Sequence, residues 1–173
     1  MEPWLTPDEP TVSPRKADLL KGLDQVGYIL ETYLRDLPDE ALWWTPDVHV
    51  PSIGARLQHI IGASLRLATY ALEDGYDPDV LAAQAPQDWV ATGRSKADLL
   101  SEIHRTLTDI RARIVALPDE ALDEARPVGR RRIPGRRAAI RHQLVQHAAH
   151  HPRQVAHQTR LGKHGTSGKR CGA

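Results

Sequence analysis

The stretch LVQHAAHHPRQVAHQTRLG, residues 144–162, places four histidines between positions 147 and 157. Its apolar residues recur with the 3.6-residue period of an amphipathic helix. The period continues back to about residue 136, and Gly162 is of the type that commonly follows a helix end, so we expect a helix over 136–161. His150 and His157 fall on the border of its inner face. At about 100° per residue, that inner face holds Ile140, Leu144, His147, Ala148, His151, Gln154, Val155 and Gln158.

Three further segments show the same apolar period, at about residues 14–37, 52–74 and 95–117. Ser13 and Ser95 are suitable helix starts, because a serine hydroxyl accepts from free backbone N–H groups of the first turn. No segment alternates between apolar and polar residues as a half-buried strand does. The sequence therefore predicts an all-α protein, a four-helix bundle.

The connections between these helices are long, at about residues 38–51, 75–94 and 118–135. Neighbouring antiparallel helices are usually joined by roughly 2–8 residues. We therefore expect long crossover connections and parallel neighbours rather than a simple up-and-down order. We assign residues 14–162 to the bundle, 1–13 to a flexible acidic arm and 163–173 to a flexible tail.

Length and composition are typical of one globular domain. The chain has 173 residues, 40% of them hydrophobic, and no phenylalanine. Its apolar stretches are far shorter than the roughly 20 residues that cross a membrane, and its first residues lack the features of a secretory signal. The single Cys171 excludes an internal disulfide. We expect a cytoplasmic protein that does not contact membranes.

The net charge of +1 hides an uneven distribution. Residues 1–50 hold ten acids and four bases, whereas residues 122–173 hold two acids and twelve bases. Either the basic end binds an acidic partner, or contacts between the two ends of the chain cancel the charges. We favour the second explanation.

His147 and His151 are the first candidates for a metal site. Side chains at positions i and i+4 of a helix project together, so the pair can chelate one divalent ion. For the pair alone, rings satisfied by hydrogen bonds are the simpler explanation. His59, in PSIGARLQHIIGASLRLATY (residues 51–70), supplies a third imidazole at the edge of an apolar helix face. Three neutral imidazoles with one open position suit a catalytic Zn²⁺, and also Ni²⁺ or Fe²⁺.

Two motifs extend this argument. WWTPDVHVPSIGARLQHIIGAS, residues 43–64, and HAAHHPRQV, residues 147–155, resemble segments of the DinB-like (DinB/YfiT) superfamily of four-helix metalloenzymes. The resemblance covers about residues 15–162, and the superfamily includes thiol-dependent S-transferases and isomerases. It implies a DinB-like bundle in which His59, His147 and His151 bind the metal.

The sequence departs from the family pattern at two places. Ser64 stands where an acidic residue is frequent, five positions after His59. Pro152 follows His151 directly, and proline inside a helix removes a hydrogen bond and disturbs the preceding residue. We therefore expect either a kink at the site or a displaced His151.

The predicted chemistry follows from what is missing near the histidines. Metal-dependent hydrolysis usually needs a general base, but Ala148 stands where zinc proteases carry a glutamate after the first histidine, and residues 136–161 contain no carboxylate. A metal-bound thiol needs no such base. We therefore favour S-transferase-like chemistry on a small thiol or thiol adduct over hydrolysis. The side chains predicted to bind the substrate are Arg56, Arg66, Tyr70 and Gln154, unless they are ordinary solvated residues.

Two binding functions are the alternatives. A non-catalytic, metal-stabilised homodimer would use spare apolar helix faces, and dimers are the commonest homo-oligomers. Nucleic acid binding would use residues 125–141, which hold seven arginines. We do not favour it, because no aromatic side chain stands among them to stack on bases, and we expect a flexible basic loop paired with the acidic N-terminal half. His49, His104 and His164 are expected on the surface or in loops.

Overall fold

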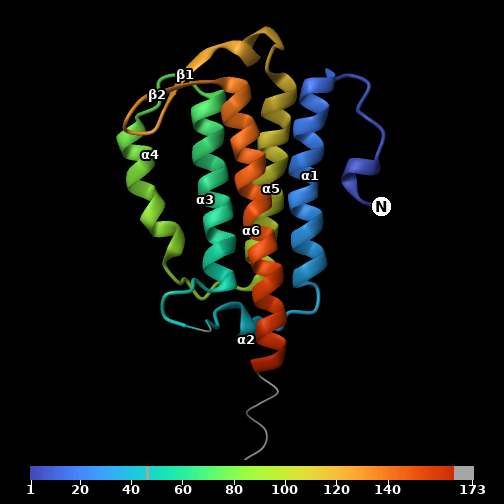
Figure 1. Ribbon diagram of the computed structural model, residues 1–173, viewed down its shortest axis with the longest axis vertical. Helices are drawn as coiled ribbons and strands as arrows, with labels where there is room; N and C mark the ends of the chain where they lie inside the picture. Colours follow the sequence, from blue (N-terminus) through green and yellow to red (C-terminus); the bar gives the residue numbers. More distant parts are fainter. Residues whose placement is uncertain (46, 166–173) are drawn as a thin grey trace, which may run out of the picture.

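The computed structural model describes residues 1–45 and 47–165, the last six as backbone. Four long helices account for most of the described chain. The elements are η1 (Pro3–Leu5), α1 (Pro14–Leu34), α2 (Asp39–Leu42), α3 (Ile53–Leu72), α4 (Pro78–Gln84), η2 (Ala85–Trp89), α5 (Lys96–Ala116), η3 (Glu120–Asp123), β1 (Ala125–Val128), β2 (Ile133–Arg136) and α6 (Arg137–Gly165). The predicted all-α class and four-helix bundle are confirmed (Figure 1).

The helix starts follow from local chemistry. The Ser52 hydroxyl accepts from the Ala55 amide and the Ser95 hydroxyl accepts from the Asp98 amide. Ser13 precedes Pro14 at the start of α1, but its side chain makes no capping hydrogen bond. The predicted end of the last helix is wrong, because α6 runs through Gly162 to Gly165. The predicted tail beyond residue 165 lies outside the described residues.

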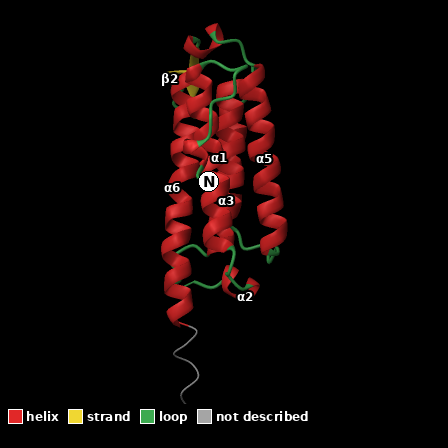
Figure 2. Ribbon diagram, turned by 90° about the vertical axis from the view of Figure 1, so that its right-hand side faces the viewer, coloured by secondary structure: helices red, strands yellow, loops and turns green. Residues whose placement is uncertain are grey.

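The four long helices enclose one core, with α6 between α1 and α3 on one side and α5 between them on the other (Figures 1 and 2). The Lys96 ammonium at the start of α5 donates to the Leu34 carbonyl at the end of α1, so these helices are antiparallel. The Arg137 guanidinium at the start of α6 donates to the Ala71 carbonyl near the end of α3, so that pair is antiparallel too. Gly22 in the third turn of α1 lies against Val145 in the third turn of α6, so α1 and α6 are parallel. Because α5 is antiparallel to α1 and α3 is antiparallel to α6, α3 and α5 are parallel too. The segment with α4 and η2 is the predicted crossover, because it returns along α3 before α5 begins (Figure 1).

The core is aliphatic, as the absence of phenylalanine requires. The apolar residues predicted on the inner face of α6 are buried: Ile140, Leu144, Ala148 and Val155. Leu144, Ala148 and Val155 pack with the apolar stripes of the other helices, including Leu23, Val26, Leu30, Leu57, Ile60, Ile103 and Ile110. Ile140 packs with Tyr70 and Ala71 in a second, smaller cluster. No described helix is both long enough and apolar enough to cross a membrane.

The basic segment before α6 is not the flexible loop that the sequence predicts. It forms an antiparallel hairpin in which Ala125 pairs with Arg136 and Val128 with Ile133. Gly129, at φ +66°, supplies the left-handed backbone of its turn. The hairpin arginines, and Arg137 directly after the hairpin, form ion pairs with Asp74 and Asp79 from earlier in the chain and with Asp123 and Glu124 directly before the hairpin.

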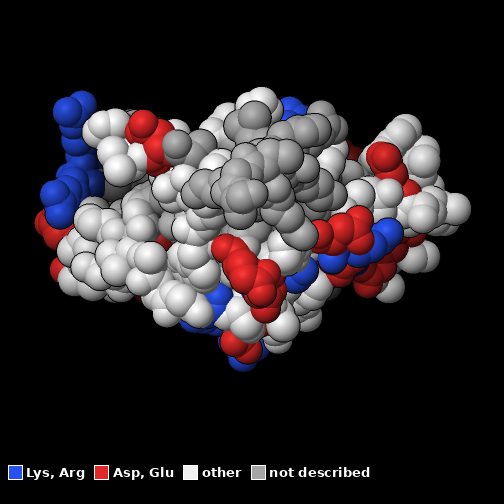
Figure 3. All heavy atoms as spheres, turned by 90° about the horizontal axis from the view of Figure 1, so that it is seen from below, with Lys and Arg blue, Asp and Glu red and all other residues white. Residues whose placement is uncertain are grey.

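The two ends of the chain do not cancel each other's charge in the expected way. Glu9 and Asp24 of the acidic end pair with Arg111 of α5, and Asp8 pairs with Lys21. Arg15 pairs with Asp123, which is the one described ion pair between the first 50 residues and the segment from residue 122 on. Seen from the α2 end, Lys and Arg residues (blue) are interspersed with Asp and Glu residues (red) rather than gathered in one patch (Figure 3).

Candidate metal centre

Three imidazoles from two helices converge near the α2 end of the bundle. His59 comes from the second turn of α3, and His147 and His151 come from successive turns of α6. The Nε2 atom of His147 lies 3.4 Å from the Nε2 of His59 and 3.4 Å from the Nε2 of His151. One nitrogen of each ring lies within 4.8 Å of the others. We call these three residues the histidine cluster.

The spacing fits a metal ion. Zinc binds imidazole nitrogen at about 2.0–2.1 Å, so two nitrogens of a tetrahedral site lie about 3.3–3.4 Å apart. Two of the three nitrogen pairs in the cluster have this separation. The cluster therefore offers three ligands to one ion.

Burial keeps the three rings neutral. Desolvation lowers the pKa of His59, and the hydrogen bond that His59 donates to Asp88 partly opposes this shift. Desolvation, together with the neighbouring His59 and His150, also lowers the pKa of His147. The pKa of His151 falls to about 4, again mainly through desolvation. A neutral ring keeps a nitrogen lone pair for a metal, so the environment favours ligation over protonation.

Hydrogen bonds select the tautomer of two of the rings. His59 Nδ1 lies 3.0 Å from Asp88 Oδ2, and His151 Nδ1 lies 2.9 Å from Gln154 Oε1. A carboxylate and an amide oxygen only accept, so both Nδ1 atoms carry the proton and both Nε2 lone pairs point into the cluster. The Arg56 guanidinium donates to the same Gln154 oxygen at 2.8 Å, which fixes the orientation of that amide.

Asp88 is held firmly behind His59. Its side chain is 8% exposed and accepts from Arg66 at 3.0 Å as well as from His59. Gln58 donates to the Asp88 and Val90 carbonyls, which ties η2 to α3. Gly62 makes room for this contact, because a Cβ there would lie 2.1 Å from Asp88 Oδ1. Such outer carboxylates orient metal-binding histidines and raise their basicity.

Trp89 borders the cluster. Its ring stacks on His59 at 4.1 Å between centroids and stands edge-on to His151 at 6.4 Å. The indole is 38% exposed. η2 therefore supplies both the carboxylate behind His59 and an aromatic wall beside it.

Neither Asp88 nor Trp89 can be recognised from the sequence as part of the site. Both lie in a 3₁₀ segment in which no apolar period exists to orient side chains. Gly62, three positions after His59, is the residue in α3 whose small size permits the close approach of Asp88.

Pro152 does not remove His151 from the cluster. α6 continues through the proline, and both Pro152 and His151 are buried. Of the two predicted alternatives, a kink at the site or a displaced His151, the displacement is excluded. The ring stays 3.4 Å from His147 because the proline acts on the backbone one turn earlier, while the His151 side chain is held by Gln154.

Of the four predicted substrate-binding residues, Arg56, Arg66 and Gln154 lie near the cluster and Tyr70 does not. Arg56 and Gln154 lie beside the cluster and contact each other. Arg66 is engaged by Asp88 through both terminal nitrogens. Tyr70 is not brought to the cluster, because it is buried against Tyr76 and Ile140 at the other end of α3. Angular position on the helix places Tyr70 beside His59, but eleven residues separate them along the axis, about 16 Å.

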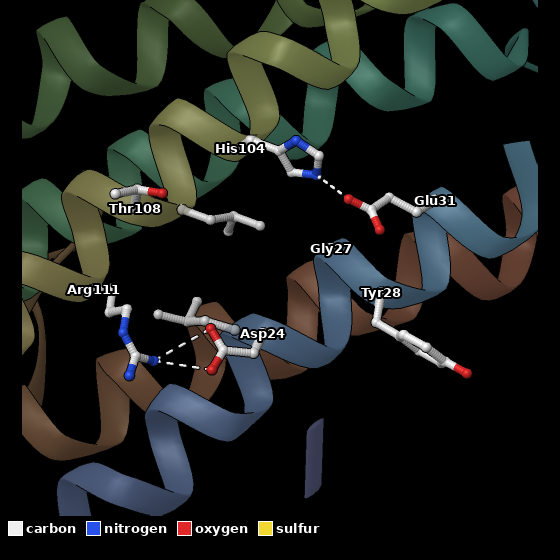
Figure 4. Close-up of a pocket in the computed structure, with 9 residues that line it drawn as sticks. Asp24, Gly27, Tyr28, Glu31, His104, Thr108 and Arg111 are labelled. Atoms are coloured by element: carbon white, nitrogen blue, oxygen red, sulfur yellow. Dashed lines mark hydrogen bonds and ion pairs between the residues drawn. The ribbon is translucent and has the colours of Figure 1, made fainter. Parts of the chain in front are cut away.

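The remaining described histidines lie outside the cluster. His150 and His157 are exposed on α6, and His49 is exposed in the loop before α3. His104 lines a cavity of about 350 Å³ between α1 and α5, which we call the α1–α5 groove. There its Nε2 lies 3.0 Å from Glu31, while Asp24 pairs with Arg111 farther along (Figure 4). The prediction of a surface position for His104 agrees with its 46% exposed side chain.

Comparison with known proteins identifies the family. The sequence profile of the DinB superfamily matches residues 22–155. The chain belongs to the DinB superfamily. The fold is similar to that of YfiT from Bacillus subtilis, described as "a probable metal-dependent hydrolase with an unusual four-helix bundle topology". The two share 14% sequence identity at a TM-score of 0.61, over 90% of this chain and 93% of YfiT. No curated protein matches the sequence.

Proposed function

We propose that this DinB-superfamily protein binds a divalent metal ion, zinc, nickel or iron, through His59, His147 and His151. The observation that carries the proposal is the approach of three neutral imidazole nitrogens, two pairs of them 3.4 Å apart. Without a cation, the Nε2 lone pairs of His59 and His151 both face His147 Nε2, which can donate a proton to only one of them. The side chains behind the rings, Asp88 and Gln154, support the tautomers that a metal requires.

We further propose that the substrate is a small thiol or a thiol adduct. When bound, a dication lowers the pKa of water to about 7 or removes the proton of a thiol. Hydrolysis also needs a base for the attacking water. Asp88 is the carboxylate in contact with the cluster, and His59 and Arg66 already occupy its oxygens. A thiol loses its proton to solvent and needs no carboxylate, so the geometry favours thiol chemistry.

Hydrolysis is the second candidate. It is favoured by the description of YfiT, whose fold this chain shares. A hydrolase would cleave activated esters or amides without added thiol and would lose that activity with the metal. A thiol-dependent transferase would consume an electrophile only when a thiol is present.

Metal analysis is the first test. The purified protein is expected to hold close to one divalent ion per chain, as three-histidine sites do, and the His147→Ala variant is expected to hold almost none. A metal-free protein that stays metal-free after supplementation would end the proposal. Titration of low-molecular-weight thiols into cobalt-substituted protein, followed by its absorption spectrum, then separates thiol binding from hydrolysis.

Two further predictions concern the state of the protein. We propose a homodimer, since bundles with spare apolar faces associate readily, and sedimentation velocity gives the mass directly. We also propose a cytoplasmic location, which cell fractionation tests.

A further inference from the structure

A second cavity lies beside the histidine cluster. Its volume is about 520 Å³, within the range of small-molecule sites. It opens between the loop before α3, the start of α3 and the later turns of α6. The described residues that line it are Val50, Arg56, His150, Arg153, Gln154, His157 and Gln158. We call it the Arg56 cavity.

The Arg56 cavity is connected to the cluster by direct hydrogen bonds. Gln154 Oε1 accepts from Arg56 and from His151 Nδ1, at 2.8 and 2.9 Å. A group bound at Arg56 would therefore lie one side chain away from a proposed metal ligand.

The lining of the cavity favours a negative charge. It holds two arginines, and none of its described lining residues is acidic. Arg56 is partly buried, and its described partners are the amide oxygens of Gln154 and Gln158. This differs from Arg66, Arg111, Arg126 and Arg137, which all pair with carboxylates. A partly buried guanidinium with only neutral acceptors still has donors suited to a carboxylate or phosphate oxygen.

Gln158 provides an independent observation. The residue is only 4% exposed, and its Nε2 is buried without a hydrogen-bond partner among the described atoms. Its Oε1 accepts from Arg56 Nε at 3.3 Å, so the unpaired amide N–H group stands next to the guanidinium. A buried donor left unpaired is unfavourable, and an acceptor oxygen placed beside it would remove this penalty.

We propose that the Arg56 cavity binds the anionic group, carboxylate or phosphate, of the small molecule whose thiol reaches the histidine cluster. Arg56 is the donor, the Gln158 amide lies beside it, and Arg153 adds a second positive charge at the rim. The inference rests on the proposed function for the thiol end of the ligand. For the anionic end of the ligand, the inference rests on the residues that line the cavity.

The test compares two thiols of equal length. The metal-loaded protein should bind 3-mercaptopropionate about tenfold more tightly than the uncharged 3-mercaptopropionamide, which corresponds to one charge-assisted contact. Isothermal titration calorimetry measures both. In Arg56→Gln the ratio should fall to about one, while Arg56→Lys, which keeps the charge, should retain part of the preference. Arg105→Gln on α5, an exposed arginine outside the cavity, is the matched control and should keep the full ratio.

The possible failures are distinguishable. Equal affinity for both thiols in the parent protein would overturn the anion site and leave the thiol-binding proposal intact. If the protein binds no metal, the proposed function fails, and the cavity is tested alone. Propionate and inorganic phosphate should then shift the side-chain amide resonance of Gln158 in the metal-free protein but not in Arg56→Gln. No shift with either anion would overturn the inference.

Discussion

Two helix interfaces of this bundle contain histidine side chains, and the two interfaces surround them with opposite kinds of partner. Between α1 and α5, His104 lies in an open groove with its Nε2 3.0 Å from the Glu31 carboxylate (Figure 4). Between α3 and α6, the three rings of the cluster face one another, and the carboxylate of Asp88 touches only the outer nitrogen of His59. In the α1–α5 groove, a carboxylate accepts from the His104 ring. In the histidine cluster, the inner Nε2 atoms contact one another.

The difference shows why a residue type alone does not identify a site. A single exposed imidazole beside a carboxylate is a weak surface ion pair. Buried imidazoles that converge on a point are kept neutral by desolvation, and their inner nitrogens have too few N–H donors to satisfy every lone pair until a cation binds. Substitutions in the two places should therefore have very different consequences.

The largest contrast is expected for metal-dependent stability. An ion that binds only the folded protein, present at about a thousandfold excess over its dissociation constant, raises the unfolding free energy by about 4 kcal/mol. This increment should vanish in His151→Ala and persist in His104→Ala. Urea unfolding with and without zinc measures it. An undiminished increment in His151→Ala would place the ion elsewhere.

The next effect is the pH dependence of the metal-free protein. Burial lowers the pKa of His151 from 6.5 to about 4, so between these values the unfolded chain binds more protons than the folded one. The stability conferred by the neutral ring is present above about pH 6.5 and is lost as the pH falls toward 4, by up to about 3 kcal/mol. Urea unfolding from pH 7 to 4.5 should show a steeper loss for the parent than for His151→Gln. Parallel slopes would contradict the assignment.

A smaller effect is expected behind the ligands. Asp88→Asn keeps the shape of the side chain but weakens its hold on the His59 tautomer, and outer carboxylates of this kind typically change metal affinity by about 10–100-fold. Competition with a chelating dye measures the dissociation constant. Asp24→Asn, which removes a carboxylate from the α1–α5 groove, is the matched control and should leave the constant unchanged. An unchanged constant in Asp88→Asn would show that Asp88 serves only to anchor η2.

Much of the fold follows from the sequence because each long helix buries one face. The 3.6-residue period of leucine and isoleucine marks that face and also turns His147 and His151 inward. The hairpin at residues 125–136 could not be found this way, since its four-residue strands contain proline and glycine and show no alternation. The period also says nothing about the position of short 3₁₀ segments.

The site could be predicted only in part for the same reason. Helical geometry selects the three rings but not their outer partners, because Asp88 lies 29 residues from His59 and reaches it through the tertiary fold. Tyr70 shows the reverse error: it has the right angle on the helix and the wrong height. Contacts made by the crossover segment, such as that of Asp88 with His59, cannot be predicted from helical periodicity and are seen only in the structure.

The smallest effect is expected in the α1–α5 groove. Glu31→Gln removes the carboxylate that faces His104 Nε2, and because both side chains are about half exposed, the contact should contribute less than about 1 kcal/mol to the free energy of unfolding. Urea unfolding should therefore give nearly the same midpoint for the variant and the parent, with metal content unchanged. A loss of bound metal in this variant would mean that the α1–α5 groove is coupled to the histidine cluster through the core. The α1–α5 interface, where a carboxylate faces His104, and the α3–α6 interface, where the cluster needs a cation, could then no longer be regarded as independent.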